Sequence, residues 1–340
     1  MLNGSVTGAI DYFNRQRTGL PNTDNTVILP NEVGFNLPKA NVGSDAQMGG
    51  DFNLAYNTKI DNLAISVGGN WGFSRKKDLQ LNSNPQFGNS LDYYRNSTIN
   101  RWDAISWGYE VIGQFQTQQQ INSYKVNNDG KGNMTQLPGD FIYKDQNGDG
   151  VINQLDQRPI GYGSNNSQPM QNFGFNFTLA SNGFDFRADF SGGTGYSIVR
   201  GWEMAVPYQN GGNLNADFAK NSWHRVDPYD VNSAWIAGKY PALTFNNGNG
   251  NNYNGANATP SFWITQVKYF RARTIELGYT LPKSIINKMK IQKLRVYINT
   301  YNLFSFDNMK KYGIETEITD NNGLQYPQNR VVNFGVNLAF

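Results

Sequence analysis

Apolar and polar side chains alternate with a period of two along most of the long segments of this chain, which is the spacing of a β-strand whose two faces meet different surroundings. In segment 63–74, Val67 and Trp71 share one face, and small or polar residues such as Ser66 occupy the other. The pattern predicts roughly eight long strands, with ends uncertain by about 2–4 residues. They lie near 4–13, 46–58, 63–74, 173–180, 184–191, 265–281, 291–304 and 329–340.

The last predicted strand alternates up to an aromatic terminus. Its large apolar residues are Val332, Phe334, Val336, Leu338 and Phe340, and the small or polar residues between them are Asn333, Gly335 and Asn337. A strand in the wall of a membrane barrel turns apolar side chains to lipid and polar ones to the lumen. We therefore expect the first set to face lipid and the second set to face the lumen.

The predicted strands are joined alternately by short and very long connections. Segments 57–62, 181–183 and 282–290 are short, whereas about 75–167 and 191–264 are long. Tight turns at one end and large loops at the other are typical of an antiparallel transmembrane β-barrel. Within the long loops we expect short helices near 117–124 and 214–223, a short strand near 140–144, and a flexible surface stretch at 246–252.

A soluble β-sandwich or solenoid is the alternative architecture, since its strands alternate as well. Strands in sandwiches are usually shorter than ten residues, and loops of this length are uncommon there. Strand and loop length therefore favour a barrel.

Composition narrows the class of protein further. Hydrophobic residues make up only 38% of the chain while aromatics reach 14% beside 36 glycines, which is an unusual mixture for a globular enzyme. No cysteine is present, which excludes a disulfide framework, thiol catalysis and Cys-ligated metals. The net charge of +3 comes from basic and acidic residues spread along the chain, so we expect no nucleic-acid partner. No apolar helical span of about 18 residues occurs, so a membrane protein of this composition must be a barrel.

Catalytic constellations are poor. The single histidine, His224, lies in a long loop, where a locally bonded side chain is the more common role than a general base. The carboxylate pair Asp185 and Asp189 lies on a strand face that also carries basic residues. The Gly-rich stretches lack a following helix and the Gly-Lys-Ser/Thr of a phosphate loop. The sequence predicts neither an enzyme nor a nucleotide site.

One loop matches a calcium-binding pattern. Side-chain oxygens of Asp145, Asn147 and Asp149 stand at positions one, three and five, Gly150 is at six, the carbonyl of Val151 is at seven, and Asp156 is at twelve. The closing residue is aspartate instead of glutamate, and good flanking helices are lacking. A structural Ca²⁺ is the interpretation we adopt, and a turn in which the Asp and Asn side chains bond their own backbone is the alternative.

Aromatic residues recur in the long loops. Trp202, Trp223, Trp235 and Tyr240 are candidates for stacking on a sugar ring or gripping a lid protein. The alternative for each ring is packing of the loop against itself.

Several segments together resemble the SusC/RagA family of TonB-dependent outer-membrane transporters, and the resemblance spans nearly the whole chain. They are GDFIYKDQNGDG at 139–150, KYP at 239–241, YFRARTIELGYTLPK at 269–283, LRVY at 294–297, YNLF at 301–304, YPQNR at 326–330 and the terminal strand. Each segment is short, but the combination and its order are specific.

The resemblance implies a barrel of about twenty-two strands closed around an amino-terminal plug. It also implies a SusD-like lipoprotein as lid, energy supplied by TonB-ExbB-ExbD, and Phe340 as a signal for barrel assembly. Nothing in the sequence matches the plug, the TonB box or a signal peptide. We therefore expect 1–340 to be the carboxyl-terminal part of such a barrel, in the outer membrane of a Gram-negative, Bacteroidetes-type cell.

The first functional hypothesis is import of glycan or peptide oligomers across the outer membrane, with membrane lipid around the barrel. The second is a secreted or surface carbohydrate-binding or adhesive β-protein that uses the loop aromatics. Neither the cargo nor the oligomeric state follows from the sequence.

Overall fold

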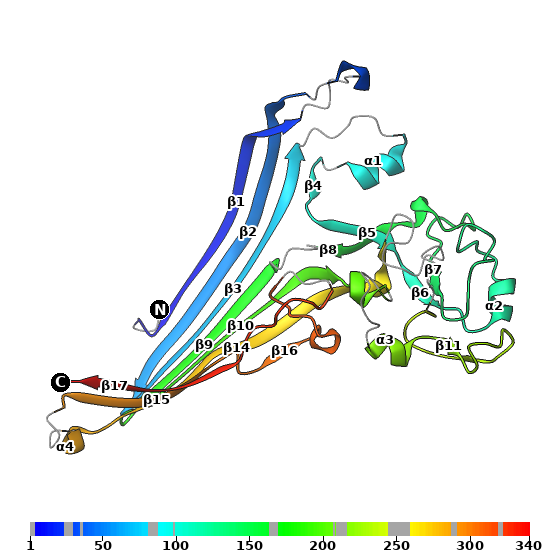
Figure 1. Cartoon of the computed structure of the whole chain (residues 1–340). Coiled ribbons are helices and arrows are strands. Elements are labelled where there is room, and N and C mark those ends of the chain that lie inside the picture. The colour runs from blue at the N-terminus through cyan, green and yellow to red at the C-terminus, as the bar shows by residue number, and fades with distance from the viewer. Residues whose placement is uncertain are drawn as a thin grey trace.

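A computed structural model describes residues 4–23, 30–34, 37–80, 88–97, 99–162, 169–206, 208, 216–243, 259–286, 291–318 and 322–340. The predicted flexible stretch 246–252 lies outside these residues. Long strands run side by side and curve together, with most of the small elements toward one end and both termini and α4 (Lys283–Ile286) toward the other (Figure 1). No helix among the described residues is long and apolar enough to cross a membrane.

The long strands form one antiparallel sheet in the order β1-β2-β3-β9-β10-β14-β15-β17, with β4 and β16 paired at its side. The bounds are β1 Val6–Thr23, β2 Lys39–Ile60, β3 Leu63–Gln80, β9 Gln171–Ser181, β10 Phe184–Val199, β14 Ile264–Thr280, β15 Lys293–Tyr301 and β17 Val331–Ala339. All eight predicted strands are confirmed, and each pairs with its neighbours along the chain. Several of them extend further than predicted at the end that carries the long loops.

The connections between the long strands contain small elements, and one of them, α4, lies in the short connection between β14 and β15. The helices are α1 Ser90–Asn96, α2 Gln118–Ser123, α3 Ala216–Asn221 and α4 Lys283–Ile286. The short strands are β4 Arg101–Trp102, β5 Ile105–Tyr109, β6 Val111–Gln114, β7 Phe141–Tyr143, β8 Arg158–Tyr162, β11 His224–Arg225, β12 Trp235–Ile236, β13 Thr259–Pro260 and β16 Ser305–Asp307. Helices α2 and α3 and strand β7 confirm the three small elements that the sequence predicts.

The turn between β9 and β10 shows why a strand reverses at this point. Asn182 and Gly183 both adopt the left-handed backbone region, with φ of 48° and 85°. Two such residues in succession match the right-handed twist of the strands that they join. A Cβ on Gly183 would also approach the Thr280 carbonyl oxygen to 2.6 Å, so this position requires glycine.

The sheet has one apolar face, which we call the outer face. In the register of the sheet one apolar row runs from β3 to β17 through Ile65, Leu179, Phe186, Leu277, Ile298 and Phe334. Phe334 is 82% exposed and Ile10 of β1 is 81% exposed. So large an exposed apolar surface is stable only against an apolar medium, which for a strand wall is the membrane.

The opposite face is polar, and we call it the inner face. Arg295 Nε donates to Asp185 Oδ1 at 3.0 Å, and its Nη2 donates to Glu276 Oε1 at 2.6 Å. Asn299 Nδ2 donates to Glu276 Oε2 at 3.2 Å, and Asn333 Nδ2 donates to Asn299 Oδ1 at 3.0 Å. The predicted division of the last strand into an apolar and a polar face is confirmed, because Asn333 belongs to this network while Phe334 lies in the apolar row.

Within the described residues, β1 and β17 each pair with a single long strand. The sheet is therefore an open section of an antiparallel transmembrane β-barrel.

Candidate functional site

Two arginines of β14, Arg271 and Arg273, lie on the same face of the sheet at a β-bulge. Thr274 pairs with Asp189 and Ala272 pairs with Phe190, so Arg273 is an extra residue on its strand. A bulge re-aims the side chain of the extra residue. Arg273 Nε donates to Ser191 Oγ at 2.5 Å, which fixes its guanidinium on the inner face beside that of Arg271.

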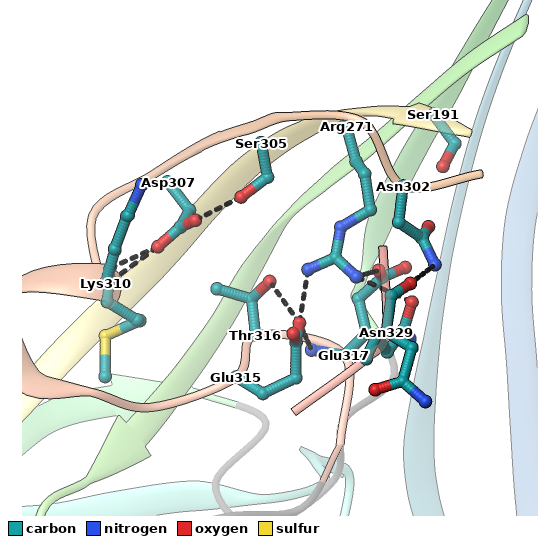
Figure 2. A network of polar contacts seen from close by, with 12 residues as sticks. Ser191, Arg271, Asn302, Ser305, Asp307, Lys310, Glu315, Thr316, Glu317 and Asn329 are labelled. Atoms are coloured by element: carbon teal, nitrogen blue, oxygen red, sulfur yellow. Dashed lines mark hydrogen bonds and ion pairs between the residues drawn. The ribbon is translucent and has the colours of Figure 1, made fainter. Parts of the chain in front are cut away.

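The two arginines clamp the connection between β15 and β17. Arg271 forms ion pairs with Glu315 and Glu317, the latter at 3.0 Å between Nη1 and Oε2, and Arg273 forms a second pair with Glu317. Only 6% of the Arg271 side chain is exposed, against 32% of the Arg273 side chain. Figure 2 shows Arg271 and the two carboxylates facing one another where the loop turns back onto the sheet. We call these four residues the arginine clamp.

Further hydrogen bonds hold the same loop in place. Gln328 Oε1 accepts a hydrogen bond from Arg271 Nη1 at 2.6 Å, and the Tyr196 hydroxyl donates to the Thr316 carbonyl oxygen. Asp307 Oδ1 accepts from the amides of Met309 and Lys310, which starts a short 3-10 turn. The loop and the wall together line an open polar pocket of about 290 Å³ beside the clamp.

An apolar cluster lies close to the clamp. Its buried residues include Tyr196, Val267 and Tyr269 of the wall and Met309 and Ile314 of the loop. Burial of ion pairs is costly unless each charge is matched and hydrogen-bonded. The clamp matches two positive charges with two negative ones, but Arg271 Nε and Glu317 Oε2 are buried without a hydrogen-bond partner among the residues that the structure describes. The clamp positions a charged loop on the inner face. Its four side chains supply neither a nucleophile nor an acid–base pair.

The clamp was not predicted from the sequence. Arg271 and Arg273 lie in the segment 269–283 that resembles the family, but neither glutamate was singled out. The available signal is the pair of like charges two residues apart in each segment, Arg271 with Arg273 and Glu315 with Glu317.

The predicted calcium loop is closed by its own backbone amides. Asp145 accepts from the amides of Gly148 and Gly150 at 2.7 and 2.8 Å, and Asp149 accepts from that of Val151 at 2.9 Å. The buried Asp156 accepts from the amides of Gln146 and Asn153. Asn147 Oδ1 accepts from Asp149 N, and its amide group holds the pKa of the Asp149 carboxyl below its usual value.

These contacts fit the self-bonded turn that the sequence leaves as the alternative to an ion site. Within the described residues no three His, Asp or Glu side chains gather as metal ligands. Each carboxylate oxygen that accepts one amide keeps a second lone pair, so Asp145 and Asp156 retain capacity for a cation. Calcium binding by Asp145, Asn147, Asp149, Val151 and Asp156 stays a prediction.

Replacing Asp145 by alanine tests the turn and the ion separately. We expect hydrogen exchange at the amides of Gly148 and Gly150 to rise about tenfold, because both lose a charged acceptor. This rise is expected in EDTA as well as in calcium. If calcium binds, its addition to the unsubstituted protein slows exchange across 145–156 further. Identical exchange with and without calcium would contradict calcium binding and support the self-bonded turn alone.

Two of the predicted loop aromatics lie in the interior of the loops. Only 3% of Tyr240 and 4% of Trp223 are exposed. The Tyr240 ring stacks on Phe218 at 4.2 Å between centroids and on Trp263 at 6.0 Å. As ligand-stacking candidates Trp223 and Tyr240 are therefore wrong, because a folded loop core already covers their rings.

The Tyr240 hydroxyl has a structural partner. It donates to Asp217 Oδ2 at 2.5 Å, and this hydrogen bond holds the pKa of the Asp217 carboxyl below its usual value. Burial raises the pKa of Tyr240. The pair joins α3 to the segment that follows β12.

The other candidates lie nearer the surface. Trp235 is half-buried, with the Arg225 guanidinium 5.0 Å from its ring centroid. Trp202 begins a 3-10 helix, Trp202–Met204, and its side chain is outside the described part. His224 Nδ1 lies 2.9 Å from the Ser222 carbonyl oxygen, the local contact expected of a loop histidine.

The curated proteins that this chain resembles are named TonB-dependent receptors. TonB-dependent receptor P39 of Formosa agariphila is 24% identical over 352 residues, which cover 92% of this chain and 32% of that protein. TonB-dependent receptor P26 of the same organism is 24% identical over 368 residues, covering 100% of this chain and 33% of the relative. The chain thus spans about a third of the length of the curated relatives that it matches. No family model matches it.

Solved structures give the same fold. The RagAB peptide importer in its open-open state superposes with a TM-score of 0.66 at 18% identity, covering 100% of this chain and 33% of that chain. The structure of the RagAB peptide transporter gives a TM-score of 0.60 at 17% identity, covering 99% of this chain and 34% of that chain. With the ordered sequence hallmarks and the two-faced strand wall, these likenesses support the resemblance of the chain to the SusC/RagA family of TonB-dependent outer-membrane receptors, and the solved structures show the shared fold.

Proposed function

We propose that this chain forms part of the barrel wall of an outer-membrane importer that takes up oligomeric nutrients. The observation that carries the proposal is the contrast between the two faces of the sheet. The apolar outer face suits lipid, and the inner face carries fixed charges and a loop held against it by Arg271 and its partners. A wall of this kind surrounds a polar lumen, through which a hydrophilic solute passes without meeting the membrane.

The proposal includes the partners of the whole receptor. A SusD-like lipoprotein serves as lid over the long loops, and TonB-ExbB-ExbD supplies energy from the inner membrane. The supporting facts are the curated relatives, which are named TonB-dependent receptors, and the fold shared with a peptide importer. The cargo that we propose is a peptide or glycan oligomer, since both classes are hydrophilic and need a wide polar lumen.

Uptake by the intact receptor tests the proposal. We expect cells that lack the receptor to lose growth on one oligomeric nutrient and to regain it when the gene is restored. A protonophore should abolish accumulation of that nutrient while surface binding persists. Accumulation that is unaffected by the protonophore would contradict energised import.

Fractionation separates this proposal from a secreted carbohydrate-binding protein. The receptor is expected in the detergent-extracted outer-membrane fraction. Recovery of native protein from the soluble fraction, with binding of glycan but no uptake, would favour the secreted protein instead.

A further inference from the structure

The outer face of β3 changes from apolar to cationic toward the long-loop end. Alternate residues on this face are Val67, Gly69, Trp71 and Phe73, and the next two are Arg75 and Lys77. Trp71 and Phe73 lie with ring centroids 5.3 Å apart and are both exposed. Aromatic side chains mark the interface of a membrane with water. The two cations therefore lie just beyond the edge of the apolar band.

Aromatic rings hold both cations. Trp102 of β4 pairs with Lys77 in register, which puts its indole on the same outer face. The Arg75 guanidinium carbon lies 4.8 Å from the centroid of Trp102 and 5.3 Å from that of Tyr162, and Lys77 Nζ lies 5.6 Å from that of Trp102. Such contacts orient a cation without neutralising its charge.

The charges of Arg75 and Lys77 are unmatched within the described part of the chain. Neither side chain has an ion pair there, and Arg75 Nε is buried without a hydrogen-bond partner. The contrast is Lys76 between them, which faces inward and pairs with Asp78 at 3.0 Å and with Asp103 at 3.4 Å. Carboxylates thus neutralise the inner cation, whereas the two outer cations have no acidic partner.

A shallow apolar depression lies on the same face of the same strand. It has a volume of about 370 Å³ and is lined by Gly69 together with Leu54, Tyr56, Trp71 and Phe175. A Cβ on Gly69 would meet only the Gly174 carbonyl oxygen, at 3.8 Å. The space is therefore present because this position lacks a side chain. At about 3.3 Å per residue, Gly69 lies roughly 20 Å along the strand from Arg75.

We propose that this face binds one phosphate-bearing lipid of the outer leaflet. The lipid phosphate lies on Arg75 and Lys77, and an acyl chain follows β3 down to the depression at Gly69. Arginine and lysine in such a position supply the charge-assisted hydrogen bonds that phosphate oxygens accept. A free anion would use the cations but not the depression, and a neutral lipid would use the depression but not the cations. The proposal depends on the membrane position of the wall and not on the cargo.

Native mass spectrometry of the intact receptor in neutral detergent tests the proposal with two probes that share their acyl chains. Dimyristoyl phosphatidylglycerol carries a phosphate, and dimyristoylglycerol does not. We expect the receptor to retain the first lipid preferentially. The double variant Arg75→Gln with Lys77→Gln should bind it about thirtyfold more weakly, because each cation near a headgroup contributes about a fivefold factor.

Matched variants distinguish the loss of positive charge from a general disturbance of the fold. Arg75→Lys keeps the charge and should keep most of the retention, and Lys59→Gln removes a cation at the short-turn end of the neighbouring strand and should change nothing. Gly69→Leu fills the depression and should weaken retention of both lipids. Equal retention by the double variant and the unsubstituted receptor would overturn the proposal. Displacement of the lipid by inorganic phosphate at the same concentration would overturn it in favour of a free-anion site.

Discussion

Replacing Arg271 by methionine is expected to release the loop between β15 and β17 from the inner face. Glu315 then loses its ion-pair partner, and Glu317 keeps only Arg273. Removing one partner of a buried charge pair costs about 3–5 kcal/mol, because the remaining charge stays desolvated. The loss is expected to be local, in the segment 308–318. Hydrogen exchange or limited proteolysis of this segment in the intact receptor measures it.

The companion variant Arg273→Met is the matched control. Its side chain is about one-third exposed, and Glu317 remains paired with Arg271 when it is removed, so a smaller effect of about 1 kcal/mol is expected. Adding Glu315→Gln and Glu317→Gln to Arg271→Met should recover much of the loss, because no buried carboxylate then remains unpaired. Equal effects of the two arginine variants would show that burial does not govern the clamp.

The existence and order of the strands could be predicted because lipid and lumen demand opposite side chains at alternate positions. The strand ends could not, and β10 shows why. Its alternation is clear from Phe184 to Phe190, but the residues from Tyr196 to Val199 are all buried. At the long-loop end, loop elements cover both faces of the strand. Both faces there favour similar residues, so the period-two signal ends before the strand does.

The clamp could not be predicted from the local sequence pattern, because its paired arginines and glutamates are far apart in the chain. Arg271 and Glu315, for example, are separated by 44 residues. Their meeting depends on a loop that turns back onto the wall. The loop aromatics mislead for a related reason. Trp223 and Tyr240 stand among polar residues in the sequence, yet Phe141, Phe218 and Trp263 from other segments build a core around Tyr240. Only the fold brings these segments together.

Gly139→Ala is expected to disrupt the packing of the long loops. Gly139 has φ of 95°, and a Cβ there would lie 2.3 Å from Cγ of Trp223. The left-handed backbone costs an alanine about 1–2 kcal/mol, and forcing atoms against a packed indole costs about 1–3 kcal/mol more. Gly139 is the first residue of the segment 139–150, which resembles the family. The Trp223 side chain packs directly against its backbone, which explains why this position is glycine. The fluorescence of Trp223 and the thermal unfolding of the intact receptor report the change.

Gly130→Ala separates the two causes of the expected loss. Gly130 also has a positive φ, of 72°, but no atom lies within 4 Å of a Cβ built there. It should therefore show the backbone cost alone, about 1 kcal/mol, and leave the Trp223 emission unchanged. Adding Trp223→Leu to Gly139→Ala should relieve the contact and recover part of the stability lost in Gly139→Ala. If the two glycine variants were equally destabilised, the indole contact would contribute nothing, and the backbone conformation alone would account for the glycine at 139.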